Sequence, residues 1–229
     1  MKRTWLVWLA LTATVAFGCN RSDNSAATRG ADSAAVGTSG ESNNKVSGGD
    51  KDFVRDAAIV NMAEIELGRL ATERGANPEV KKFGQMMIDD HTKAEDQLKS
   101  VASQQSIDVP SQLDDKHNKL RDKLSKLQGA DFDREYMDAM VDGHQDFAGK
   151  LESRVDKAKL QEWKTEMANR AAGRRVEERG QTIAILPEKS DNPVTMSINQ
   201  WAADTYPTVI AHLDAAKALE TAVKQRTTH

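Results

Sequence analysis

Apolar residues recur every three or four positions from Asp52 onward, a spacing that places them on one side of an α-helix. Glycine and proline interrupt this pattern at residues 75–78, 107–110, 129 and 187–193. The expected helices therefore cover residues 52–74, 78–105, 112–127, 131–155 and 159–179, with a last helix from the turn at 187–193 to about residue 224. The pattern predicts an all-α protein.

Local signals support the ends of these helices. Asn77 is expected to cap the second helix, with Pro78 at its first position, where a missing N–H has no cost. Asp131 is expected to cap the helix that follows Gly129. Pro207 lies within the last helix, where it removes one backbone hydrogen bond and should kink the helix.

Four of the predicted helices are long and carry a continuous apolar stripe: 52–74, 78–105, 131–155 and the last one. Short connections make successive helices antiparallel, so we expect a ferritin-like antiparallel four-helix bundle. The shorter helix at 112–127 and the segment 156–192 would pack outside it as accessory elements. The bundle domain is expected to span residues 52–225.

Composition agrees with this fold and limits the partners. Charged residues make up 29% of the chain and aromatic residues only 5%, in keeping with a helix-rich protein. The formal net charge is -3, and no basic patch dominates. Nucleic acid is therefore not an expected partner, and the sequence points to no protein partner.

The first 19 residues have the composition of a bacterial signal peptide. Lys2 and Arg3 precede an apolar run over residues 5–17, which is too short to span a bilayer. The sequence 16–19 (Ala-Phe-Gly-Cys) resembles a lipobox, although Ala16 stands where leucine is usual and Phe17 where a small residue is usual. Lipidation at Cys19 would attach the protein to a membrane. The alternative is an ordinary signal peptide, cleaved after Ala16 or Gly18.

Residues 20–51 consist mostly of Ser, Gly, Asn, Ala and Thr and are expected to form a disordered tether. Together, signal and tether predict a protein of the periplasm or cell envelope, anchored through Cys19 to the outer membrane.

One ionisable residue interrupts the apolar stripe of each long helix, near its middle: Glu64, His91, His144 and His212. In an antiparallel bundle the helix middles meet at one level, so these four side chains are predicted to form one layer of the core. Three imidazoles and a carboxylate are suitable ligands for one divalent Zn, Fe, Mn or Cu ion. A hydrogen-bonded Glu–His layer without metal is the alternative.

Two-iron chemistry is disfavoured, because it needs a carboxylate three residues before a histidine on two helices. Those positions are occupied by Ile88, Val141 and Val209. The acidic residues next to the histidines, Asp90 among them, are expected to point away from the layer.

Several segments resemble a bacterial family of unknown function, number 4142 in the domain-of-unknown-function series, whose members are often labelled ferritin-like or outer membrane proteins. The resemblance rests on four groups of residues: Phe53 with 62–68, 87–92, 132–137 leading to His144, and 206–209 leading to His212 and Leu213. It implies a ferritin-like bundle exported to the envelope and implies no activity.

Three functional hypotheses follow. The one that we favour is a non-catalytic envelope lipoprotein whose bundle binds one metal ion in a structural or stress-related role. The second is an oxidoreductase that uses the same ligands to act on superoxide or peroxide. The third is a metal-free scaffold or interaction module with a polar layer in its core.

Overall fold

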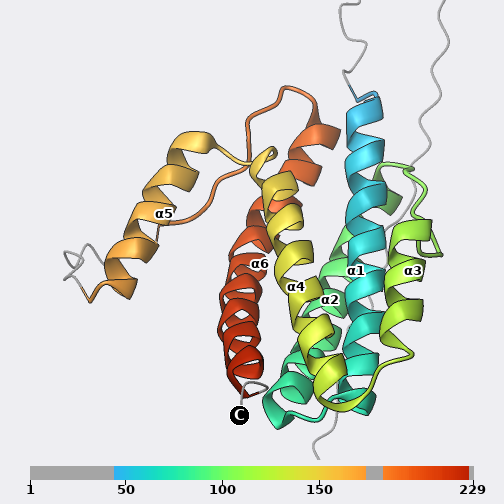
Figure 1. Cartoon of the computed structure of the whole chain (residues 1–229). Coiled ribbons are helices and arrows are strands. Elements are labelled where there is room, and N and C mark those ends of the chain that lie inside the picture. The colour runs from blue at the N-terminus through green and yellow to red at the C-terminus, as the bar shows by residue number, and fades with distance from the viewer. Residues whose placement is uncertain (1–43, 174–182, 227–229) are drawn as a thin grey trace, which may run out of the picture. The chain divides into compact units, whose positions relative to one another are not determined.

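The computed structural model describes residues 44–173 and 183–226, and these residues form six helices (Figure 1). The helices are α1 (Gly48–Arg74), α2 (Pro78–Gln104), α3 (Asp115–Leu124), α4 (Gly129–Glu152), α5 (Lys157–Ala171) and α6 (Pro193–Arg226). The all-α prediction is confirmed. The predicted signal peptide, Cys19 and most of the predicted tether lie outside the described residues.

The bundle consists of two antiparallel helix pairs, α1 with α2 and α4 with α6. In the first pair, Asn61 meets His91 and Gly68 meets Gly84. In the second pair, Tyr206 donates a hydrogen bond to Glu152, and residues 138 and 224 form an ion pair. Partner positions rise on one helix as they fall on the other, as antiparallel packing requires.

The connection from α2 to α4 crosses the length of the bundle and contains α3. Ion pairs join Lys116 to Asp146 and Lys123 to Glu135, so α3 runs antiparallel to α4. Because α3 returns the chain to its starting end, α2 and α4 run in the same direction (Figure 1). Successive long helices were expected to be antiparallel through short connections. Among the four long helices, only α1 and α2 are joined by a short connection, and the expectation is wrong for α2 and α4. A single long crossover is the connectivity of ferritin-like bundles.

Four helix starts differ from the prediction: α3 begins at Asp115 and α5 at Lys157, where residues 112 and 159 were expected, and α1 and α4 begin earlier than expected. Helix α1 begins at Gly48, within the predicted tether, because the Ser47 hydroxyl caps it by accepting a hydrogen bond from the Asp50 N–H at 3.0 Å. Helix α4 begins at Gly129, so Asp131 lies in its first turn and is not its cap. Helix α6 is continuous through Pro207. Glycine usually interrupts a helix, but Gly48 and Gly129 are the first residues of α1 and α4, so these two helices begin earlier than the pattern predicts.

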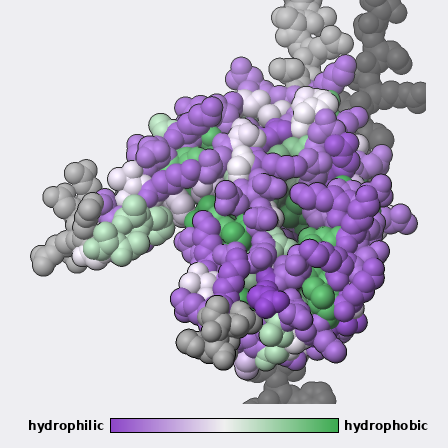
Figure 2. Space-filling view, in the orientation of Figure 1, coloured by the Kyte–Doolittle hydropathy of each residue, from purple (hydrophilic) through white to green (hydrophobic). Residues whose placement is uncertain are grey.

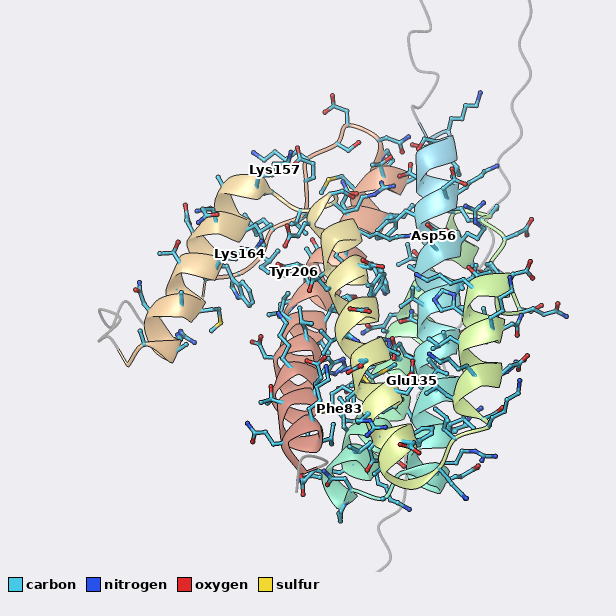
Figure 3. All side chains as sticks on the ribbon, in the orientation of Figure 1. Asp56, Phe83, Glu135, Lys157, Lys164 and Tyr206 are labelled. Atoms are coloured by element: carbon cyan, nitrogen blue, oxygen red, sulfur yellow. The ribbon has the colours of Figure 1, made fainter. Side chains whose placement is uncertain are left out.

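The core consists of two apolar clusters, one in each half of the bundle. One contains Phe147, Leu151, Ile198, Trp201 and Tyr206 among its residues. The other includes Phe83, which is labelled in Figure 3, with Met87, Phe132, Tyr136 and Met140. Between them, the middle of every long helix carries polar side chains. The predicted polar layer lies in this interval.

Helix α5 packs on the outside of the bundle, as predicted for an accessory element. Leu160 is buried in the first cluster, and the Trp163 ring lies edge-on to the Tyr206 ring at 5.7 Å. Figure 3 shows Lys164 on the side of α5 that faces the bundle, where its Nζ lies 2.6 Å from Glu152 Oε1. The same carboxylate accepts the Tyr206 hydroxyl at 2.7 Å.

The surface visible in Figure 2 is mostly hydrophilic. Among the described residues, none of the helices combines the length and the apolar character that crossing a bilayer would require.

Candidate metal centre

The four residues predicted to share one core layer are all buried. Glu64 is 5% exposed, His91 3%, His144 1% and His212 3%. They come from α1, α2, α4 and α6 respectively, and each interrupts the apolar stripe of its helix near the middle.

In each of the three imidazoles, one ring nitrogen forms a hydrogen bond with an oxygen atom. His91 Nδ1 lies 2.9 Å from Asn61 Oδ1, His144 Nδ1 lies 2.9 Å from the Met140 carbonyl oxygen, and His212 Nε2 lies 2.9 Å from Asp90 Oδ2. The carbonyl and carboxylate oxygens can only accept, and Asn61 accepts through Oδ1. These contacts therefore assign the ring proton to the held nitrogen and leave the other nitrogen of each ring with a free lone pair.

The three free nitrogens are His91 Nε2, His144 Nε2 and His212 Nδ1, all buried and without a hydrogen-bond partner. The ring centroids are 5.6 Å apart for His91 and His144 and 5.4 Å for each of the other two pairs. One ring nitrogen from each histidine lies within 4.8 Å of those from the other two. An ion with bonds of about 2.0 Å holds nitrogens at roughly 3.4 Å from one another, so small ring rotations would complete a site.

Glu64 lies beside this cluster and is not one of its three members. Its Oε1 is 3.8 Å from His144 Nδ1, the nitrogen that faces the Met140 carbonyl, and its Oε2 has no partner. Burial raises the pKa of Glu64 to about 8, so in the metal-free protein the carboxyl is mostly protonated at neutral pH. The structure thus brings three of the four predicted residues together, with the fourth adjacent.

Burial also lowers the pKa of each histidine in the layer. The pKa of His91 falls well below its ordinary value through burial and the neighbouring imidazoles, and that of His144 falls to about 4 for the same reasons. For His212, burial lowers the pKa and the Asp90 carboxylate opposes part of the shift. All three rings are therefore neutral near pH 7, the form that binds metal.

Unpartnered polar atoms gather around this layer. Besides the three histidine nitrogens, Asn61 Nδ2, Glu64 Oε2 and Tyr136 Oη are buried without a hydrogen-bond partner. Burial, with the nearby Glu64, raises the pKa of Tyr136 well above its usual value. Native proteins leave few such atoms unpaired, so these atoms are available to bind water or an ion.

Sequence reasoning missed the residues that orient the rings. Asn61 shares the core stripe of α1 with Glu64, but an amide was not expected there to hold an imidazole. Asp90 was expected to point away from the layer, and this was wrong. Its side chain turns from His91 toward α6, because adjacent helix positions differ by about 100°. The sequence did contain a signal for this contact: a carboxylate that follows His91 directly and faces a neighbouring helix that carries a histidine.

The chain matches the family model described as "Domain of unknown function (DUF4142)" over residues 35–173. The match covers more than half of the chain, which therefore belongs to this family. The matched residues include Glu64, His91 and His144 and end before α6, so the expected resemblance around residues 206–213 lies outside them. No curated protein and no solved structure matches the chain significantly.

Proposed function

We propose that this protein binds one divalent transition-metal ion through His91 Nε2, His144 Nε2 and His212 Nδ1. The observation that carries the proposal is that these three nitrogens, from three helices, are buried without a hydrogen-bond partner, in three histidines whose ligand atoms lie close together. Each opposite ring nitrogen is held by an oxygen acceptor, the arrangement that orients histidine ligands in metal sites.

The donor set favours Zn, Fe, Mn or Cu. Three imidazoles offer nitrogen without thiolate, while the Glu64 carboxyl lies on the Nδ1 side of His144, next to this donor set and outside it. The role that we propose is structural or stress-related. A structural role is supported by the two apolar clusters, which lie on both sides of the layer. An ion there would join three helices.

A second candidate function is a mononuclear oxidoreductase acting on superoxide or peroxide. It is favoured by the donor count, since three protein ligands leave a coordination position free, as catalytic sites do. The unpartnered Glu64 and Tyr136 beside the layer are polar groups that such a site could use. A bound redox metal together with turnover of superoxide or peroxide would select this function.

Metal content tests the proposal directly. We expect about one Zn²⁺ or Co²⁺ per whole chain after dialysis, and a melting temperature that rises with metal concentration. His91→Ala with His144→Ala should abolish both effects. His117→Ala, which removes a histidine of α3 outside the layer, should abolish neither. Wild-type protein that binds no Zn, Co, Mn, Fe or Cu and gains no thermal stability would refute the proposal and leave a metal-free interaction module.

For the location, we propose export and attachment to the outer membrane through an acylated Cys19. The support is the sequence alone: two basic residues, an apolar run and a cysteine, followed by residues of tether composition. Incorporation of labelled palmitate into the wild type but not into Cys19→Ser would support it. Equal labelling, or none in either, would exclude it.

A further inference from the structure

The three acceptors that hold the imidazoles differ in their contact with solvent. Asn61 is fully buried and the Met140 residue is 1% exposed, whereas 44% of the Asp90 side chain is exposed. Asp90 is also the only ionisable acceptor of the three. The His212–Asp90 hydrogen bond therefore connects the buried layer to the surface at the contact between α2 and α6.

A carboxylate acceptor changes what the histidine can do. It stabilises positive charge on the ring, so His212 Nδ1 becomes a stronger donor to a cation than an imidazole bonded to a neutral carbonyl. It also fixes the ring so that Nδ1, and not Nε2, faces the layer. A hydrogen bond between two exposed side chains would contribute little to stability; this one matters because the His212 ring is buried.

Building on the proposed function, we propose that Asp90 is the positioning residue of the metal site and that the ion exchanges past the Asp90–His212 pair. His91 and His144 are held by buried groups and stay in place. His212 is held by a side chain that water reaches, so its bond opens most readily. When this bond opens, the ring turns, one ligand is lost and the ion can leave between α2 and α6.

The test compares Asp90→Ala with wild type in the whole chain, using Co²⁺ and Zn²⁺ alone as probes. We expect Asp90→Ala to weaken Co²⁺ binding by about 10- to 100-fold. Transfer of Co²⁺ to EDTA in a stopped-flow experiment should accelerate by a similar factor. The visible absorption bands of the Co²⁺ protein should change, because His212 no longer binds in one orientation.

Two further variants separate positioning from charge. Asp90→Glu keeps an acceptor for His212 and should restore most of the affinity and the wild-type bands. Asp89→Ala removes the neighbouring carboxylate, which is exposed and accepts a hydrogen bond only from Gln85 among the bonds described, and should behave as wild type. Circular dichroism and melting curves establish that all variants fold.

The outcomes distinguish this inference from the proposed function. Wild-type protein that binds none of Zn, Co, Mn, Fe and Cu would overturn both proposals. Wild-type binding with an unchanged affinity, EDTA transfer rate and spectrum in Asp90→Ala would overturn the role of Asp90 and leave the three-histidine site standing. An equal loss in Asp89→Ala would show that only surface charge matters and would likewise overturn it.

Discussion

Glu64 is a buried carboxyl group of α1 beside the three histidines. Its Oε2 lacks a partner, and its pKa is raised to about 8 by burial from an ordinary value of 4.5. Folding therefore takes up a proton at this residue between these two pH values. The stability that it contributes is complete below about pH 4.5 and is lost as the pH rises to about 8.

Glu64→Gln should remove this loss, because an amide cannot ionise. In the metal-free protein, the free energy of unfolding of the variant should rise relative to wild type by up to about 1.4 kcal/mol for each pH unit between pH 4.5 and 8. Urea unfolding in EDTA at pH 5, 6.5 and 8 measures the difference. Glu66→Gln, on the more exposed side of α1, is the control for removing one carboxylate. A difference that stays constant with pH would contradict the prediction.

At the scale of elements, α1 and α2 approach each other through two glycines. A Cβ atom added at Gly84 would lie 2.7 Å from Ala71 Cβ and 2.8 Å from the Gly68 carbonyl oxygen. The opposing Gly68 would place a Cβ 2.6 Å from the Gly84 carbonyl oxygen. These distances are too short for carbon and oxygen atoms, so the helix pair that carries Asn61 and His91 depends on the missing side chains.

Gly84→Ala should therefore destabilise the protein by about 1–3 kcal/mol, because the backbones must move apart. Gly149→Ala provides a matched control on α4, since Gly149 is exposed and a Cβ there would meet nothing within 4 Å. This control should stabilise by about 0.5–1 kcal/mol, the ordinary gain for alanine in a helix. Urea unfolding measures the change in the free energy of unfolding for both variants. Equal changes in both would refute the packing argument.

At the scale of the whole molecule, Arg154, which follows α4, joins this part of the chain to the start of α1 at one end of the bundle. Its guanidinium lies 2.6 Å from Asp50 Oδ1, donates to the Gly49 carbonyl at 2.7 Å and lies over the Phe53 ring. Burial alone raises the pKa of Asp50, but hydrogen bonds from Ser47, Thr195 and Arg154 outweigh it and hold the pKa below its ordinary value. The buried carboxylate is thus ionised and needs its partners.

Arg154→Met should cost about 3–5 kcal/mol of unfolding free energy, because it leaves the Asp50 carboxylate buried and without its cation. Arg55→Ala removes an exposed arginine that pairs with Asp52 and Asp56, and should change stability by no more than about 1 kcal/mol. Thermal and urea unfolding compare the two. Similar losses of unfolding free energy in both variants would show that Arg154 stabilises the protein no more than an exposed arginine does.

The sequence by itself determined which segments are helical and which residues face the core. Helix formation and the facing of side chains depend on a local period of 3.6 residues, so spacing along the chain is sufficient. It also placed Glu64, His91, His144 and His212 at one level. The position of each residue along its helix can be read from the sequence, without knowing how the helix is rotated about its axis.

Only the tertiary structure decided how these residues meet. The crossover through α3 set which long helices run in the same direction, a choice that depends on contacts such as Lys116 with Asp146. The rotation of each helix placed Glu64 beside the histidine cluster and turned Asp90 toward α6. Which nitrogen is free in His91 and in His212 follows from acceptors that lie 30 and 122 residues away in the chain, and such contacts have no signature in local spacing.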